Sequence, residues 1–110
     1  MESGIYHFRF QGGPSGNYGD GIAVLKDGTI NGGDVGYVYR GSYKTEGNRL
    51  IAKINLKQWK MVPNALFNLP EFAINIDAPL PGDLKNFTLE GRLEGAGSVH
   101  LVGRRLENVA

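Results

Sequence analysis

The chain contains no cysteine, which excludes disulfide frameworks, thiolate catalysis and cysteine-based zinc sites. No stretch approaches the roughly 20 apolar residues that cross a bilayer, and the first ten residues lack the basic and apolar regions of a secretory signal. The net charge of +1 implies no nucleic acid, membrane or strongly acidic partner, so any such contact would have to be local. We expect a cytoplasmic protein that binds neither nucleic acid nor membranes.

Glycine, in contrast, is abundant. The 110 residues include 17 glycines, well above the usual share of about 7%, and this density argues against a helical protein. The length suffices for one hydrophobic core and is too short for a second. We therefore predict a single domain that covers residues 1–110.

The apolar residues recur with a period of two along most of the chain, which is typical of strands with one buried face. In 87–93, for example, Phe87, Leu89, Gly91 and Leu93 alternate with polar residues. The same analysis predicts about eight short strands, at 6–10, 18–25, 29–32, 37–44, 49–57, 72–77, 87–93 and 98–106.

Turn signals rich in glycine and asparagine separate these segments, at 26–29, 46–48, 79–83 and 94–97. Strands joined by short turns form an antiparallel meander, and eight of them can close into an up-and-down barrel without an exposed edge. We predict this all-β barrel. A sandwich of two sheets is the alternative, because alternation does not distinguish closure from stacking.

The segment 57–72 has two prolines and no alternation, and Pro63 could begin one helical turn. We expect a connection that crosses one end of the barrel or packs against another subunit. Its apolar residues form either a lid on the core or a dimer or partner surface. These residues are Trp59, Met61, Val62, Leu66 and Phe67.

The stretch GTINGGD at 28–34 raises the question of a phosphate or metal loop. No lysine with serine or threonine follows its glycines, and the next segment is a strand, so neither a P-loop nor a dinucleotide fingerprint fits. A calcium loop would need an acidic residue where Val38 stands. We predict instead that the glycines allow tight turning and close backbone approach, and that Asp34 accepts hydrogen bonds from turn amides.

No residue is nominated for catalysis, metal binding or cofactor binding. Glu90 and Glu94 would lie about 13 Å apart along one strand, beyond the separation of glycosidase carboxylates. His7 and His100 could approach each other on the outer surface if the first strand pairs with the last, but two histidines without a third ligand make a poor metal site.

The aromatic and basic residues of 37–44 alternate, so they point to opposite faces of the strand. Inward rings suit a barrel lining better than a platform for stacking bases. Such an interior could be filled by its side chains, or it could hold a small apolar ligand. The candidate walls of that cavity are Tyr6, Phe8, Tyr37 and Tyr39.

Five short motifs together resemble one family: GIY at 4–6, GDGI at 19–22, GGD at 32–34, VYRG at 38–41 and VPNALF at 62–67. Their order and spacing are similar to those of the GrlR-type regulators, which restrain the transcriptional activator of a bacterial type III secretion system. The resemblance covers roughly the first two thirds of the chain.

The resemblance implies an eight-stranded, lipocalin-like barrel that forms a homodimer and acts by protein contact without catalysis. In the family, an acidic run in one hairpin contacts the activator, and its position matches 45–48 here. Only Glu46 is acidic in this chain, so the pattern differs at that point. We expect partner contacts at Glu46, Asn48 and Arg49, and at the segment that contains Trp59.

Overall fold

The computed structural model describes residues 1–12, 18–61, 69–95 and 97–110. Eight strands account for most of them, which confirms the all-β prediction, and each lies within a few residues of its predicted position. The strands are β1 (Gly4–Gly12), β2 (Tyr18–Lys26), β3 (Thr29–Gly33), β4 (Tyr37–Glu46), β5 (Arg49–Gln58), β6 (Glu71–Pro79), β7 (Phe87–Leu93) and β8 (Gly97–Glu107).

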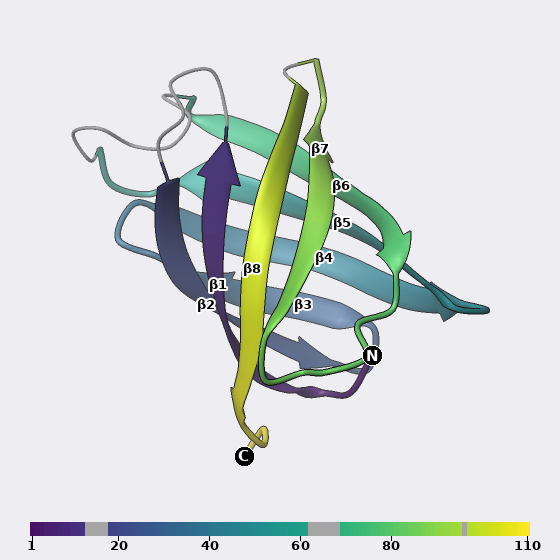
Figure 1. The fold of residues 1–110 in the computed structure, drawn as a ribbon. Helices are drawn as coiled ribbons and strands as arrows, with labels where there is room; N and C mark the ends of the chain where they lie inside the picture. The colour runs from purple at the N-terminus through teal and green to yellow at the C-terminus, as the bar shows by residue number, and fades with distance from the viewer. Residues whose placement is uncertain (13–17, 62–68, 96) are drawn as a thin grey trace.

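The strands form one closed up-and-down barrel. Each strand pairs antiparallel with the next along the chain, and β1 also pairs with β8, from Ile5–Glu107 to Gly12–Val99. Figure 1 shows β1 lying between β2 and β8. The first and last strands thus complete the ring, which confirms the barrel and excludes the sandwich.

One junction of the ring is shorter than the others. β6 and β7 pair at Ile74–Leu93, Asn75–Arg92 and Ile76–Gly91, and beyond these pairs the two strands diverge (Figure 1). The loop between them is fixed to its surroundings, because the Leu80 N–H donates to the Asn48 carbonyl at 2.7 Å and the Leu84 carbonyl accepts from the Arg105 N–H at 2.7 Å. Both leucines pack against the core.

Side chains fill the interior of the barrel. Inward residues alternate with outward ones, and Tyr6, Ile74, Val99 and Leu101 are at most 1% exposed. Aromatic rings pack edge to face, as in the Phe10–Tyr39 pair with ring centroids 5.6 Å apart. A cavity between the described strands has only apolar lining and a volume of about 30 Å³, which is close to that of one water molecule.

The stretch 28–34 forms a turn and a closely packed short strand. Asp27 and Gly28 have φ values of 51° and 79°, as expected for the two-residue hairpin turn between β2 and β3. At Gly32, an added Cβ would lie 2.0 Å from the Ile22 carbonyl oxygen, so β3 approaches β2 closely at this residue. The structure confirms the prediction that these glycines serve turning and backbone approach.

The connection after β5 lies partly outside the described residues. β5 ends at Gln58 and β6 begins at Glu71, and the predicted helical turn at Pro63 falls in the part that is not described. Where the chain is described, it has no helix of the length and apolar character needed to cross a bilayer.

Candidate functional site

Asp34 organises the connection between β3 and β4. Its Oδ1 accepts hydrogen bonds from the N–H groups of Gly36 and Tyr37, both at 2.8 Å, which confirms the predicted turn contacts. Its Oδ2 accepts a hydrogen bond from the buried Tyr39 hydroxyl. This carboxylate therefore holds the turn against the interior of the barrel.

The tyrosines at this end of the barrel remain neutral donors. Burial, followed by the hydrogen bond and charge of Asp34, raises the pKa of Tyr39 far above its ordinary value. Burial also raises the pKa of Tyr37, whose hydroxyl donates to the Leu69 carbonyl at 2.6 Å. Both hydroxyl groups thus connect the barrel wall to the loops above it.

Trp59 lies on the same turn and faces solvent. Its backbone N–H donates to the Gly36 carbonyl at 2.9 Å, and its indole N–H donates to the Asp34 carbonyl at 3.2 Å. The side chain nevertheless remains 59% exposed. Trp59 is therefore not buried in the core, and the choice between a lid and a contact surface for this segment stays a prediction.

Three other exposed apolar side chains belong to the same end of the barrel as Trp59. We call these four residues the apolar rim: Val35, Trp59, Met61 and Leu69. Val35 is in the turn against which Trp59 lies and is 71% exposed. Met61 is 83% exposed, and Leu69, whose carbonyl binds Tyr37, is 44% exposed. Val62, Leu66 and Phe67, which were predicted for this surface, lie outside the described residues.

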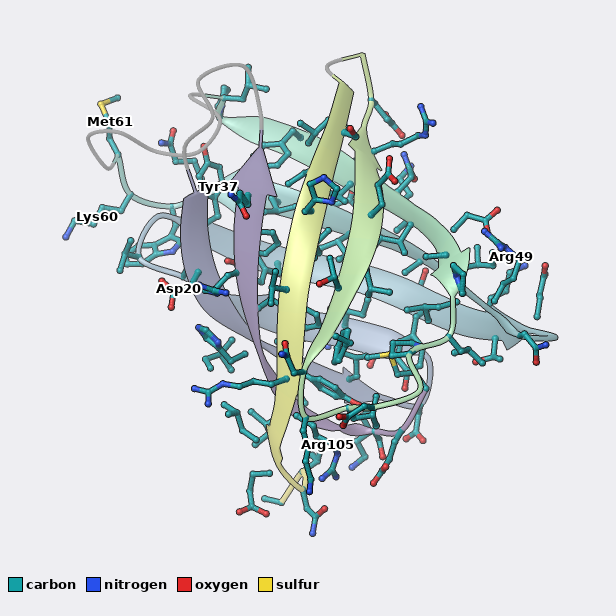
Figure 2. The ribbon with its side chains drawn as sticks, in the orientation of Figure 1. Asp20, Tyr37, Arg49, Lys60, Met61 and Arg105 are labelled. Atoms are coloured by element: carbon teal, nitrogen blue, oxygen red, sulfur yellow. The ribbon has the colours of Figure 1, made fainter. Side chains whose placement is uncertain are left out.

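The hairpin between β4 and β5 lies far from this rim. Arg49 begins β5 and Gln58 ends it, so about 30 Å of extended strand separates the two places. Figure 2 shows Arg49 on one side of the barrel and Lys60 and Met61 on the other. The two predicted contact regions therefore form separate surfaces.

The three predicted hairpin residues are exposed, and each also contacts a neighbour. Glu46 pairs with Lys44 at 2.8 Å, while the Asn48 carbonyl receives the Leu80 N–H. Arg49 donates from Nε to the Asp77 carboxylate at 2.6 Å and from Nη2 to the Asp77 carbonyl at 2.9 Å. These contacts position the hairpin beside β6.

The four predicted cavity residues all point inward, and each of their polar groups is occupied by the protein itself. The Tyr6 hydroxyl donates to the Glu2 carbonyl at 2.6 Å, and those of Tyr37 and Tyr39 donate to Leu69 and Asp34 as described. The Phe8 ring packs against Phe87, with centroids 5.9 Å apart.

The prediction that His7 and His100 could approach each other across β1 and β8 is wrong. β1 does pair with β8, but the register places His7 opposite Arg104 and His100 opposite Gln11. The two histidines are therefore about four residues, or 13 Å, apart along the ladder.

His7 instead contacts Asp20 at 2.8 Å on the outer surface of β1 and β2. No serine, threonine or further carboxylate completes this pair among the described residues, which also contain no group of three or more potential metal ligands.

Sequence reasoning did not nominate Val35 and Leu69, which complete the apolar rim. For Val35 a signal was present, since an apolar residue between a turn aspartate and a glycine has no strand face to occupy. Leu69 stands directly before Pro70, and no periodicity marks it.

Comparison with known proteins agrees with the fold and with the motifs. The sequence model of one family, described as "T3SS negative regulator, GrlR", matches residues 1–108, which is nearly the whole chain. A search among curated proteins found no match. On the strength of the family match, this chain belongs to the GrlR family of type III secretion negative regulators.

Proposed function

We propose that this protein acts in the cytoplasm by protein contact and without catalysis, as a homodimer that restrains a transcriptional activator of type III secretion genes. Membership of the GrlR family supports the regulatory role. The observation that carries the contact proposal is the apolar rim, with Val35, Trp59 and Met61 each more than half exposed. Neighbouring exposed apolar side chains of this kind are typical of protein interfaces.

The way Trp59 is held supports a role in recognition. Its backbone and indole hydrogen bonds to 34–36 fix the ring while most of its surface remains in water. A fixed ring loses little conformational entropy on binding, and tryptophan is enriched among the residues that dominate interface energies. We propose that a second subunit or the activator covers this ring.

The hairpin residues Glu46, Asn48 and Arg49 form the second proposed contact region. Their exposure supports this proposal, but the hairpin carries one acidic residue where the family has an acidic run. We therefore propose that this protein's partner differs in charge from the activators that the acidic run recognises.

Replacement of Trp59 tests the proposal. We expect Trp59→Ala to weaken dimerisation or activator capture at least about tenfold, while the free energy of unfolding falls by no more than about 1 kcal/mol. Leu106→Ala is the matched control, because Leu106 is 44% exposed on β8, outside the rim. Native mass spectrometry measures the dimer, and a pull-down measures capture of the activator.

The outcomes separate the roles of the rim. Loss of the dimer assigns it to the subunit interface, and loss of activator capture from an intact dimer assigns it to the partner. If both survive Trp59→Ala as well as they survive Leu106→Ala, the rim proposal is wrong.

The alternative function is transport of a small apolar ligand inside the barrel. The apolar lining of the interior is the observation in its favour. Its volume of about 30 Å³ is far below the roughly 300 to 1,000 Å³ of typical ligand pockets, so loading would require the barrel to expand. A reproducible small-molecule adduct on protein purified from its own source would favour transport, whereas an unmodified mass would favour protein contact.

A further inference from the structure

The near-zero net charge conceals a separation of charge. Residues 37–60, which comprise β4, its hairpin, β5 and the two residues that follow, carry six of the 12 lysines and arginines but only one of the 11 acidic residues. The remainder of the chain is correspondingly acidic. A local partner preference can therefore exist without any overall field.

Part of this charge gathers on the outer surface of β3, β4 and β5. Lys53, Asn55 and Lys57 are successive outward residues of β5, and the register places Arg40 beside Asn55, between the two lysines. Polar side chains without charge surround the cations. We call this set the basic face: Asn31, Arg40, Ser42, Lys53, Asn55 and Lys57.

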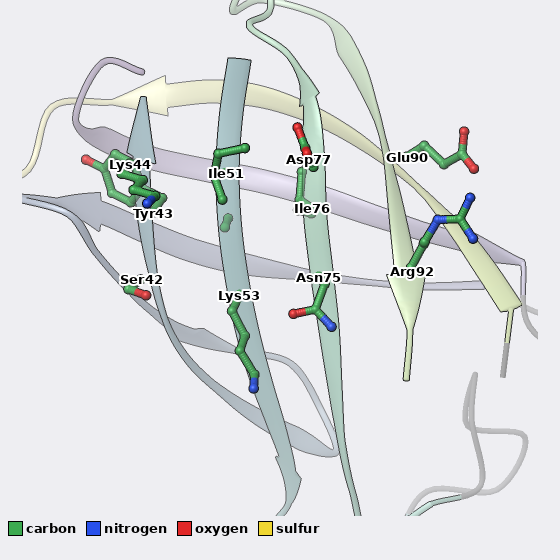
Figure 3. A pocket seen from close by; sticks show the side chains of 11 residues that line it. Ser42, Tyr43, Lys44, Ile51, Lys53, Asn75, Ile76, Asp77, Glu90 and Arg92 are labelled. Carbon is green, nitrogen blue, oxygen red and sulfur yellow. The ribbon is translucent and has the colours of Figure 1, made fainter. Parts of the chain in front are cut away.

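The basic face is hollowed and open to solvent. A shallow groove of about 700 Å³ runs over it, and Glu71 is the one carboxylate among its lining residues. Figure 3 shows the adjoining surface, where Lys53 and Asn75 lie on neighbouring strands and the charges of Asp77, Glu90 and Arg92 follow on β6 and β7. Glu71, opposite Lys57 in the register of β5 and β6, lies at the end of the basic face, and these further acidic side chains border it on one side.

The cations of the basic face are poorly neutralised within the chain. Arg40 and Lys57 make no ion pair or side-chain hydrogen bond with any residue that the structure describes, and Lys53 has only a 3.6 Å contact with Glu94. Arg49, by contrast, is paired closely with Asp77. Three neighbouring positive charges repel one another, so carboxylates from outside would relieve that repulsion.

We propose that the basic face docks an extended acidic segment of a protein partner. The inference rests on the proposed action by protein contact and adds the chemistry of the partner and the place where it binds. Outward residues on β5 repeat about every 6.6 Å, and alternate side chains of an extended peptide repeat at the same distance. Glutamates at every second position would therefore meet Lys53, Arg40 and Lys57 in turn.

The same surface is a poor match for single-stranded nucleic acid. Its phosphates would also find the cations, but its bases would need exposed rings for stacking. Tyr37 and Tyr39 are 5% and 2% exposed, because they point into the barrel. Among the side chains that the structure describes, Trp59 is the large exposed ring, beyond the end of β5, and one ring does not form a platform for successive bases.

Fluorescence anisotropy with a labelled peptide tests the docking. The probe is a short peptide in which glutamate alternates with serine, and the comparison ligands are the same peptide with glutamine for glutamate and a labelled oligothymidylate of similar length. The variant is Arg40→Glu/Lys57→Glu. The matched control is Arg9→Glu/Arg104→Glu, because Arg9 and Arg104 are exposed on β1 and β8 and their replacement changes the net charge equally.

We expect the glutamate peptide to bind, its affinity to fall with added salt, and the Arg40/Lys57 variant to bind at least about tenfold more weakly than the Arg9/Arg104 control. Circular dichroism melting curves verify that both variants fold. No binding, equal losses in the two variants, or tighter binding of the oligothymidylate would overturn the inference.

The pull-down described for Trp59 keeps the two proposals distinguishable. If a regulator is still captured while the glutamate peptide does not bind, only the acidic-segment inference fails. If the peptide binds but the purified protein captures no regulator, protein-contact regulation is what fails.

Discussion

Replacing Gly32 with alanine would test the close approach of β2 and β3. A Cβ at this residue would lie 2.0 Å from the Ile22 carbonyl oxygen and 2.8 Å from the Ala23 Cα. Both are backbone atoms, so no side-chain rotation can remove the clash. The strands must separate at the Ala23–Gly32 pair, and the hydrogen bonds around it must lengthen or break.

The expected cost follows from these contacts. Overpacking alone costs about 1 to 3 kcal/mol, and each weakened ladder hydrogen bond adds about 0.5 to 1.5 kcal/mol. We therefore expect Gly32→Ala to lower the free energy of unfolding by about 3 kcal/mol or more, out of the roughly 5 to 15 kcal/mol of a typical domain. At about 4 °C for each kcal/mol, the melting temperature should fall by about 10 °C or more.

Urea denaturation of Gly32→Ala beside Gly19→Ala measures this effect. Gly19 lies in the neighbouring strand β2, where an added Cβ meets nothing within 4 Å and the φ is not positive. Both substitutions restrict the unfolded chain similarly, so their difference isolates the clash. If the two variants unfold within about 1 kcal/mol of each other, the argument from close backbone approach is refuted.

Two further predictions concern Tyr39. Tyr39→Phe removes the hydroxyl that binds Asp34 and should lower the free energy of unfolding, measured by urea denaturation, by about 1 to 2 kcal/mol. The Tyr43 hydroxyl has no hydrogen bond to the described residues, so Tyr43→Phe should lower it by less than about 0.5 kcal/mol. Equal losses in the two variants would contradict the role given to Asp34. Burial raises the pKa of Tyr39 above its ordinary value of 10.0, so above about pH 10 the folded state keeps a proton that the unfolded chain releases. This contribution to stability should be complete below pH 10 and should fall by up to about 1.4 kcal/mol per pH unit above it. Urea midpoints across this range would disprove the assignment if Tyr39→Phe kept the full alkaline slope.

Strand positions were predictable because burial of one sheet face imposes a period of two on the sequence. Leu50, Ala52 and Leu56 on β5 show this, since each is buried as the alternation requires. Closure into a barrel was harder to predict from the sequence, because the same alternation fits a sandwich. Only the pairing of β1 with β8 decides between the two folds. That register also decided the separation of His7 from His100, which spacing along the chain does not encode.

The candidate site was predictable only in part. The contact of Asp34 with turn amides is local and follows from its place after two glycines. The Tyr39 hydroxyl reaches Asp34 only because β4 places that side chain inside the barrel beneath the turn. The exposure of Trp59 depends on the turn at 34–36, so no pattern in 57–72 could decide it.

The short junction between β6 and β7 gives the ring a point of opening in the middle of the chain rather than at its ends. The terminal strands are joined along almost the whole of β1, whereas β6 and β7 meet over the short stretch around Asn75 and Arg92. If the barrel were opened there, the resulting sheet would have β7 at one edge and β6 at the other. The terminal strands β1 and β8 would stay paired in the interior of that sheet. A circular permutant cut in the loop between β6 and β7, with its original ends fused, would have its new termini on the strands that hold each other least.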